Sequence, residues 1–216
     1  KTFLTHPTYG CRRLSYELKM NHKKISRIMR KFNLKPPRLW YQRKFTTQSN
    51  PALFNLYSNL LKGIDQKTIK IGEVWSSDLT FIKFQGKFIY LAIIQDIISK
   101  EVVSFNLSLK HDSDLVLKTL KEAVSKTGIF PKIFHSDRGS EYLSEKIIEF
   151  LEKNKVKISV SDQGSPWQNS YSESFFSRFK TESGDLNRFE ELGELIEYVF
   201  GYLDYYNRLR IHTSIK

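Results

Sequence analysis

Three successive segments rich in β-branched and aromatic residues, 73–84, 87–96 and 101–109, constrain the fold of this chain most strongly. Gln85-Gly86 and Ser99-Lys100 separate the segments as tight turns. Segments of this composition joined by such short turns predict a meander of three antiparallel strands.

The rest of the chain alternates between helical and extended patterns. Apolar residues recur at helical spacing over 113–126, with Asp112 or Ser113 as the expected N-cap. After it we expect, in order, a strand at 132–137, a helix at 144–154, a strand at 156–161 and helices at about 170–183 and 189–207. A hairpin meander followed by this alternation predicts an α/β fold, a mixed five-stranded sheet flanked by helices.

The first 50 residues are strongly basic. They hold 13 lysines and arginines against one acidic residue, Glu17, which accounts for the whole net charge of +12. Residues 10–20 and 24–34 are predicted helices, and Lys35-Pro36-Pro37 ends the second one. The pattern, with basic and aromatic residues interleaved from Arg38 to Phe45, favours nucleic-acid binding over a merely solvated basic surface. The two helices fit half of a helix-turn-helix or a plain helical hairpin.

Composition divides the chain into three parts. We predict an incomplete basic helical DNA-binding region over 1–45, a linker with one short helix over 46–70, and the sheet domain over 71–216.

Hydrophobic residues make up 40%, enough for a packed core, and no apolar run approaches the ~18 residues of a membrane helix. The single cysteine, Cys11, rules out an internal disulfide. We expect a soluble intracellular protein with no membrane partner, and a fragment of a longer chain, since Lys1 is not a Met.

Three carboxylates occupy positions that packing alone does not favour. Asp78 lies inside a predicted strand, Asp137 follows an apolar strand, and Glu173 begins a helix. Taken singly, each has an ordinary explanation as a bulge residue, a turn former or a solvated helix start. Taken together, they would supply the oxygen ligands that two divalent ions such as Mg²⁺ require for in-line attack on a phosphodiester.

Four motifs carry a resemblance to a known family. They are Trp75-Ser76-Ser77-Asp78-Leu79-Thr80, His135-Ser136-Asp137-Arg138-Gly139-Ser140, Asn169-Ser170-Tyr171-Ser172-Glu173-Ser174-Phe175-Phe176 and Tyr206-Asn207-Arg208-Leu209-Arg210-Ile211-His212. In this order, and with 35 residues between Asp137 and Glu173, the motifs resemble those of the DDE transposases of bacterial insertion sequences, which share their catalytic core with retroviral integrases.

The resemblance implies a ribonuclease-H-like fold and a catalytic, metal-binding triad of Asp78, Asp137 and Glu173. It implies two Mg²⁺ ions, with Mn²⁺ as a substitute, and double-stranded DNA, both element ends and target, as the substrate. The reaction would be cleavage of one strand at an element end followed by transfer of its 3′-hydroxyl. A homodimer or larger assembly on DNA and a bacterial cytoplasmic location would follow. The rivals are a hydrolysis-only nuclease of this fold and a catalytically silent DNA-binding protein derived from a transposase.

Further residues are candidates for contacts around the triad. His135 is expected either to orient Asp137 or touch DNA, or to be packed, and Asn169 to cap its helix or make a polar contact near Glu173. Arg210 and His212 are expected to reach DNA or to form a hydrogen-bonded cluster that fixes the last helix. The candidate DNA-binding residues are Lys180, Arg178, Arg12, Arg13, Lys23, Lys24, Arg27, Arg30, Arg210 and His212.

Overall fold

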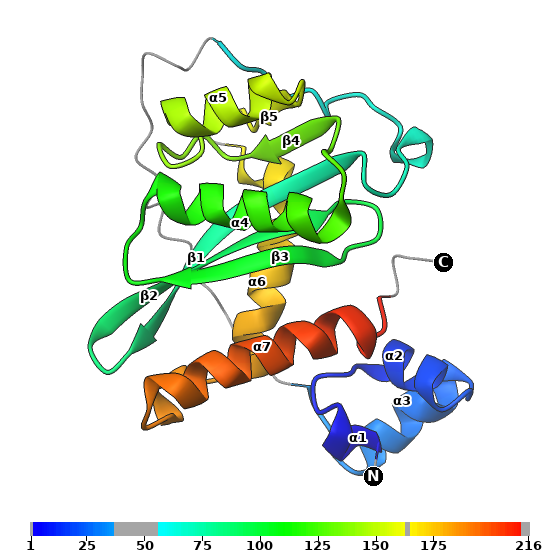
Figure 1. The fold of residues 1–216 in the computed structure, drawn as a ribbon. Coiled ribbons are helices and arrows are strands. Elements are labelled where there is room, and N and C mark those ends of the chain that lie inside the picture. The colour runs from blue at the N-terminus through cyan, green and yellow to red at the C-terminus, as the bar shows by residue number, and fades with distance from the viewer. Residues whose placement is uncertain (1, 37–55, 163–164, 213–216) are drawn as a thin grey trace.

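The computed structural model describes residues 2–36, 56–162 and 165–212, and its centre is a five-stranded sheet (Figure 1). The strands are β1 (Val74–Phe84), β2 (Lys87–Asp96), β3 (Val102–Ser108), β4 (Ile133–Ser136) and β5 (Lys157–Val160). Their order in the sheet is β3-β2-β1-β4-β5. β2 is antiparallel to β1 and β3, whereas β4 is parallel to β1 and β5. The predicted mixed sheet is confirmed.

Helices precede, interrupt and follow the sheet. The α-helices are α1 (Thr2–Thr5), α2 (Cys11–Glu17), α3 (His22–Lys31), α4 (Ser113–Thr127), α5 (Glu145–Lys153), α6 (Ser170–Ser183) and α7 (Leu192–Arg208). Short 3-10 turns lie at Gln66–Thr68, Pro166–Asn169 and Leu186–Arg188. Among the described residues, no helix has the length and apolar character needed to cross a membrane.

Local chemistry explains the turns and helix ends that the sequence predicted. Gln85 and Gly86 both have positive φ, 46° and 77°, the conformation of the two-residue hairpin turns that match strand twist. The Asp112 carboxylate accepts the Leu115 N–H and caps α4, and Gly128 ends that helix with a φ of 69°. These contacts fix the meander and the helix that crosses back over it.

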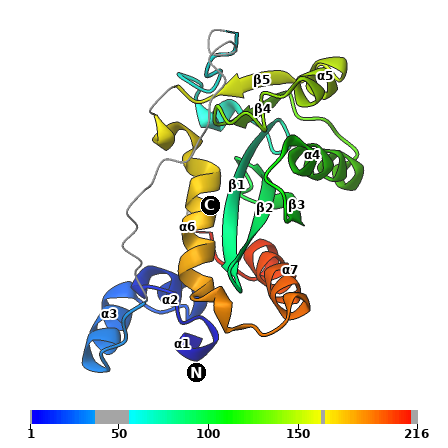
Figure 2. The same cartoon turned by 90° about the vertical axis from the view of Figure 1, so that its left-hand side faces the viewer.

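The two faces of the sheet carry separate cores. On one face, Ile89, Leu91 and Ile93 of β2 pack with the phenylalanines of α6 and with α7. On the other face, Trp75 and Ile94 pack with α4 and α5. Figure 2 shows α6 running along the sheet on the side opposite α4 and α5. Because neighbouring side chains of a strand point to opposite faces, one strand serves both cores.

The N-terminal helices form a third, smaller cluster that contacts the end of the chain. Tyr9, Leu14, Ile25 and Met29 are buried together there, with Ile211 packed against them. The Ile211 N–H donates to the Tyr9 hydroxyl at 2.9 Å. The two ends of the described chain are therefore held together beside α6 and α7 (Figure 1).

Several boundaries differ from the sequence-based expectations. In the described part, 56–70, of the linker predicted to hold one short helix, the helical element is the 3-10 turn at Gln66–Thr68. Residues 58–60 run beside β5, where the Leu60 N–H donates to Ser159 Oγ at 2.9 Å and the Val160 N–H donates to the Ser58 carbonyl oxygen at 3.2 Å. Helix α7 begins at Leu192, where Glu191 and Glu194 form a capping box. The interleaved stretch Arg38 to Phe45 lies outside the described residues.

Candidate active site

The three predicted carboxylates come from three elements that meet at one part of the sheet. Asp78 is on β1, Asp137 follows the last residue of the adjacent parallel strand β4, and Glu173 is in the first turn of α6. Two contacts beside them hold α6 against β1: Ser76 Oγ lies 2.9 Å from Ser172 Oγ, and Asn169 Nδ2 donates to the Ser77 carbonyl oxygen at 3.4 Å.

Electrostatics link the three carboxylates. Removal of water by the surrounding protein raises the pKa of Asp78 well above its ordinary value, and the charges of Asp137 and Glu173 raise it further. The Leu79 N–H, which donates to Asp78 Oδ1 at 2.8 Å, and the Lys180 ammonium act in the opposite direction. Three acidic groups are thus close enough to oppose one another's ionisation.

This donor set fits hard cations in its chemistry. Carboxylate oxygens are the preferred ligands of Mg²⁺, and cations would remove the repulsion that raises the pKa of Asp78. The side chains do not yet form a closed coordination shell: within residues 2–36, 56–162 and 165–212, no group of three His, Cys, Asp or Glu side chains is arranged to hold a metal ion.

A fourth acidic residue, Glu141, lies beside this site and was missed by the sequence analysis. Burial raises its pKa, and the charge of Asp137 adds to the effect. His111 Nε2 lies 3.3 Å from its Oε1 atom. The Tyr142 hydroxyl is buried near Asp78 and Asp137, and burial followed by these two charges raises its pKa well above the ordinary value. Only proximity to Asp137 in sequence could have pointed to Glu141 and Tyr142.

Lys180 lies near the carboxylates, as its spacing from Glu173 predicts. Its Nζ atom is 5.2 Å from the centre of the Phe81 ring, and burial lowers its pKa while the charge of Asp78 raises it. Arg178, which we expected beside the same site, is exposed and lines a different recess with Arg13. That expectation is corrected: on a helix, residues two positions apart point in different directions.

His135 is a packed residue. It is fully buried, with Nδ1 2.8 Å from Ser159 Oγ and Nε2 3.4 Å from Ser161 Oγ. Burial lowers its pKa to about 4, so the ring is neutral at pH 7. A DNA contact is thereby excluded for this conformation, and the hydrogen bonds tie β4 to β5 just before Asp137.

Asn169 makes the expected polar contact but does not cap its helix. It occupies the N-cap position of α6 without a side-chain capping bond, because its amide turns toward Ser77. Its Oδ1 atom is buried and has no hydrogen-bond partner among the residues described. The side chain therefore braces the start of α6 against β1 beside Glu173.

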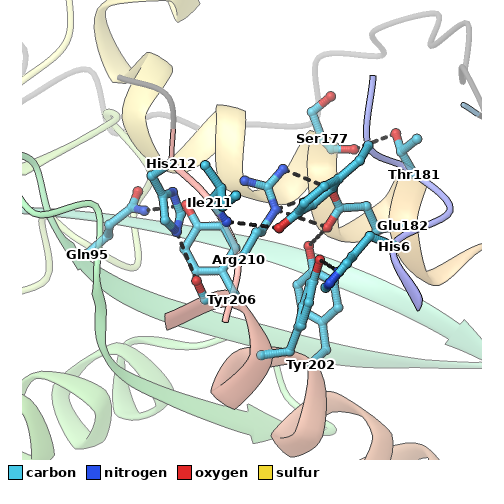
Figure 3. Close-up of polar contacts among 12 residues, drawn as sticks. His6, Gln95, Ser177, Thr181, Glu182, Tyr202, Tyr206, Arg210, Ile211 and His212 are labelled. Carbon is cyan, nitrogen blue, oxygen red and sulfur yellow. Dashed lines mark hydrogen bonds and ion pairs between the residues drawn. The ribbon is translucent and has the colours of Figure 1, made fainter. Parts of the chain in front are cut away.

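The predicted DNA contact of Arg210 is wrong for this structure. Its side chain is 1% exposed, and Nε and Nη2 donate to the Glu182 carboxylate at 2.8–3.2 Å (Figure 3). His212 is half-buried; its Nε2 lies 2.9 Å from the Tyr206 carbonyl oxygen, and its ring packs edge-on against the Tyr206 ring. The alternative interpretation, a cluster that fixes the last helix, matches these contacts.

The basic N-terminal candidates are mostly at the surface. Arg12 on α2 and four residues on α3 are exposed, the latter being Lys23, Lys24, Arg27 and Arg30. Arg13 is the exception, since it is half-buried against the Tyr9 ring, 5.6 Å from the ring centre. The exposed residues remain predicted DNA contacts.

Comparison with known proteins places this fold in a class. Residues 70–166 and 154–216 match two family descriptions, both named Integrase core domain. A chain of the simian T-cell lymphotropic virus intasome superposes over 97% of this chain and 68% of its own length, with a TM-score of 0.57 at 16% identity. The architecture is the ribonuclease-H-like fold of integrase catalytic cores.

Sequence relatives make the assignment more specific. An insertion element IS600 31 kDa protein of Shigella sonnei is 33% identical, over 98% of this chain and 79% of that protein. A transposase-like protein of Haemophilus influenzae is 31% identical, over 94% and 93%. The putative transposase InsK of insertion sequence IS150 of Escherichia coli is 28% identical, over 96% and 74%. The chain belongs to the insertion-sequence transposases with an integrase-like catalytic core.

Proposed function

We propose that this chain cleaves one DNA strand at the ends of an insertion sequence and transfers the freed 3′-hydroxyl to target DNA, with Asp78, Asp137 and Glu173 as the ligands of two Mg²⁺ ions. Mn²⁺ is expected to substitute for Mg²⁺. The observation that carries the proposal is the convergence of three carboxylates from β1, the end of β4 and α6, with the charges of Asp137 and Glu173 both acting on Asp78. The family membership of the chain supports the same reaction.

The roles of the side chains follow from their positions. When bound, paired divalent ions supply an activated oxygen nucleophile and stabilise the leaving oxygen of a phosphodiester. Asp78 has to give up any proton it holds before it acts as a ligand, so cation uptake and proton release are coupled there. The Lys180 ammonium, near Asp78, would hold a DNA phosphate next to the carboxylates.

The arrangement of the whole chain is part of the proposal. Residues 1–45 would act as a basic DNA-binding region, 46–70 as a linker and 71–216 as the catalytic core. Since transposition acts on two element ends, a homodimer or larger assembly would form on double-stranded DNA.

The test is nicking of supercoiled plasmid in Mg²⁺ or Mn²⁺ by the wild type and by Asp137→Asn, with DNA binding measured in parallel. Asp204→Asn, which removes an exposed carboxylate on α7, is the matched control. The wild type and the control should nick, and Asp137→Asn should bind DNA without nicking it. Equal nicking by Asp137→Asn would overturn the site assignment.

Two further results separate the rival functions. If wild type and variant both bind DNA and neither nicks it, the chain is a silent DNA-binding protein. Joining of a labelled donor 3′ end to target DNA distinguishes a transferase from a hydrolysis-only nuclease.

A further inference from the structure

A recess of about 170 Å³ lies between the N-terminal helices, α6 and the residues that follow α7. Three arginines from these separate segments line it, Arg13, Arg178 and Arg210, together with the carboxylate of Glu182. Arg178 follows Glu173 by five residues, a rotation of about 140° around α6 at 3.6 residues per turn. The recess is therefore on a different side of α6 from the three carboxylates of the candidate active site.

The recess carries more positive than negative charge. Glu182 is fully engaged, because Arg210 donates to both its carboxylate oxygens and the Tyr202 hydroxyl donates to Oε2 at 2.8 Å. Arg13 and Arg178 form no ion pair of their own: in the described part of the chain, neither has a carboxylate within ion-pair distance, although the charge of Glu182 still acts on Arg13. After the Arg210–Glu182 ion pair is subtracted, the recess has a net charge of two positive charges, those of Arg13 and Arg178.

The buried part of the Arg13 side chain also lacks a hydrogen-bond partner. Its Nε atom is buried and has no partner among the described residues. A buried donor without a partner is destabilising, and more so when the group is charged. Burial lowers the pKa of Arg13, and the charges of Arg210 and Arg178 lower it further. The fold thus places three arginines around the recess with only one carboxylate, Glu182, to balance their charge.

We propose that this recess binds a phosphate group. The guanidinium fork donates two parallel hydrogen bonds to phosphate oxygens, which suits Arg13 and Arg178. Hydroxyl-bearing residues complete the lining: Thr8 and Ser177 offer further donors, whereas the Thr181 hydroxyl donates to the Ser177 carbonyl oxygen at 2.7 Å. A bound phosphate would join α2 to α6 and so fasten the N-terminal helices to the core.

The backbone of DNA is the favoured source of this phosphate. Arg12 is exposed on the same helix as Arg13, and α3, which packs against α2, carries further exposed basic residues. A DNA strand could therefore contact the recess and the basic helices together. The assignment of DNA as the source rests on the proposed function, whereas the phosphate site itself does not.

The first measurement uses inorganic phosphate and the full chain. The unfolding temperature is measured in sodium phosphate and in sodium chloride of equal ionic strength, and the heat of phosphate binding is measured by calorimetry. Both measurements compare the wild type with the double variant Arg13→Gln/Arg178→Gln. Arg208→Gln, which removes an exposed arginine of α7, is the matched control. The wild type and the control should unfold at a higher temperature in phosphate, and the double variant should bind phosphate at least about tenfold more weakly. Arg178→Gln alone, a surface change, gives the same comparison if Arg13→Gln does not fold.

The second measurement identifies the source of the phosphate. Binding of a 30-base-pair duplex is followed over a range of salt concentrations without added metal, so that cleavage plays no part. If DNA supplies the phosphate, Arg178→Gln should reduce the slope of log K against log salt by about 1, and Arg208→Gln should not. A phosphate-dependent rise in unfolding temperature with an unchanged slope identifies free phosphate as the ligand. If phosphate has no effect on the wild type and Arg178→Gln and Arg208→Gln share the wild-type slope, the site does not exist, whether or not the protein cleaves DNA.

Discussion

Replacement of Arg210 by Met removes one half of the most deeply buried ion pair in the described chain. The side chains of Arg210 and Glu182 are 1% and 8% exposed. Met replaces the aliphatic part of the Arg210 side chain but removes its charge. The Glu182 carboxylate then keeps only the hydrogen bond from the Tyr202 hydroxyl and the attraction of the Arg13 charge. Breaking a buried pair from one side costs about 3–5 kcal/mol, and since Arg13 still attracts Glu182, we expect about 3 kcal/mol. For a chain of this length that lowers the unfolding temperature by roughly 6–12 °C.

The loss should depend on pH in a defined direction. Burial acts to raise the pKa of Glu182, but its hydrogen bonds and ion pair with Arg210 outweigh burial and lower the pKa. A lowered folded-state pKa stabilises the protein above the unfolded value, about 4.3, and that stabilisation disappears as pH falls through the folded value. Because the unfolded-state pKa is the same for both proteins, their difference should be constant near neutrality and shrink as pH falls through the folded-state pKa of Glu182 in Arg210→Met, which burial raises once Arg210 is absent.

Urea and thermal unfolding, followed by circular dichroism from about pH 3 to pH 8, measure both effects. Arg208→Met is the control, because Arg208 is 78% exposed and its 2.7 Å pair with Asp204 is at the surface. The control should cost less than about 1 kcal/mol. A loss for Arg210→Met no larger than that of the control, or a loss independent of pH, would refute the assignment of Arg210 to a buried structural pair.

Two more substitutions test the candidate active site. Asp78→Asn removes a carboxylate whose pKa is raised by burial and by Asp137 and Glu173, so the metal-free variant should be about 1 kcal/mol more stable than wild type at pH 8. Because wild-type Asp78 takes up a proton below its raised folded-state pKa, the gain should shrink as pH falls; a variant of equal or lower stability would contradict the crowding of the three carboxylates. Lys180→Met should reduce nicking and lower the salt slope of DNA binding by about 1, and unchanged nicking would remove Lys180 from the reaction.

Local signals in the sequence predicted most of the fold. All five strands and helices α4 to α7 lie within a few residues of their predicted positions, because period and turn chemistry act over neighbouring residues. Gln85-Gly86 and Asp112 are examples in which a short motif determined a turn or a cap. The pairing of residues 58–60 with the edge strand β5 was not predicted, because no local pattern in the linker indicates which strand it contacts.

Contacts between distant segments could not be predicted in this way. His135 and Arg210 both lie in motifs of the family resemblance, yet their burial depends on β5 and on Glu182, which the motifs do not contain. The basic recess is a stronger case, since Arg13 and Arg178 come from separate segments with no shared pattern. Sequence analysis could identify these residues as basic, but not which of them share one space.

Helix α6 connects the two surfaces that the structure brings to light. Its apolar side, with Phe175 and Phe179 fully buried, is packed in the core against the sheet and α7. A helix fixed by such packing does not rotate freely, so the positions of Glu173 and Arg178 on its other sides are set together. A phosphate held at Arg178 and Arg13 would therefore restrain the same rigid element that presents Glu173 to Asp78. In this arrangement, the proposed DNA contact of the N-terminal helices and the alignment of the carboxylates would both depend on one helix, which would give a physical reason for the packing of the N-terminal helices against the rest of the chain.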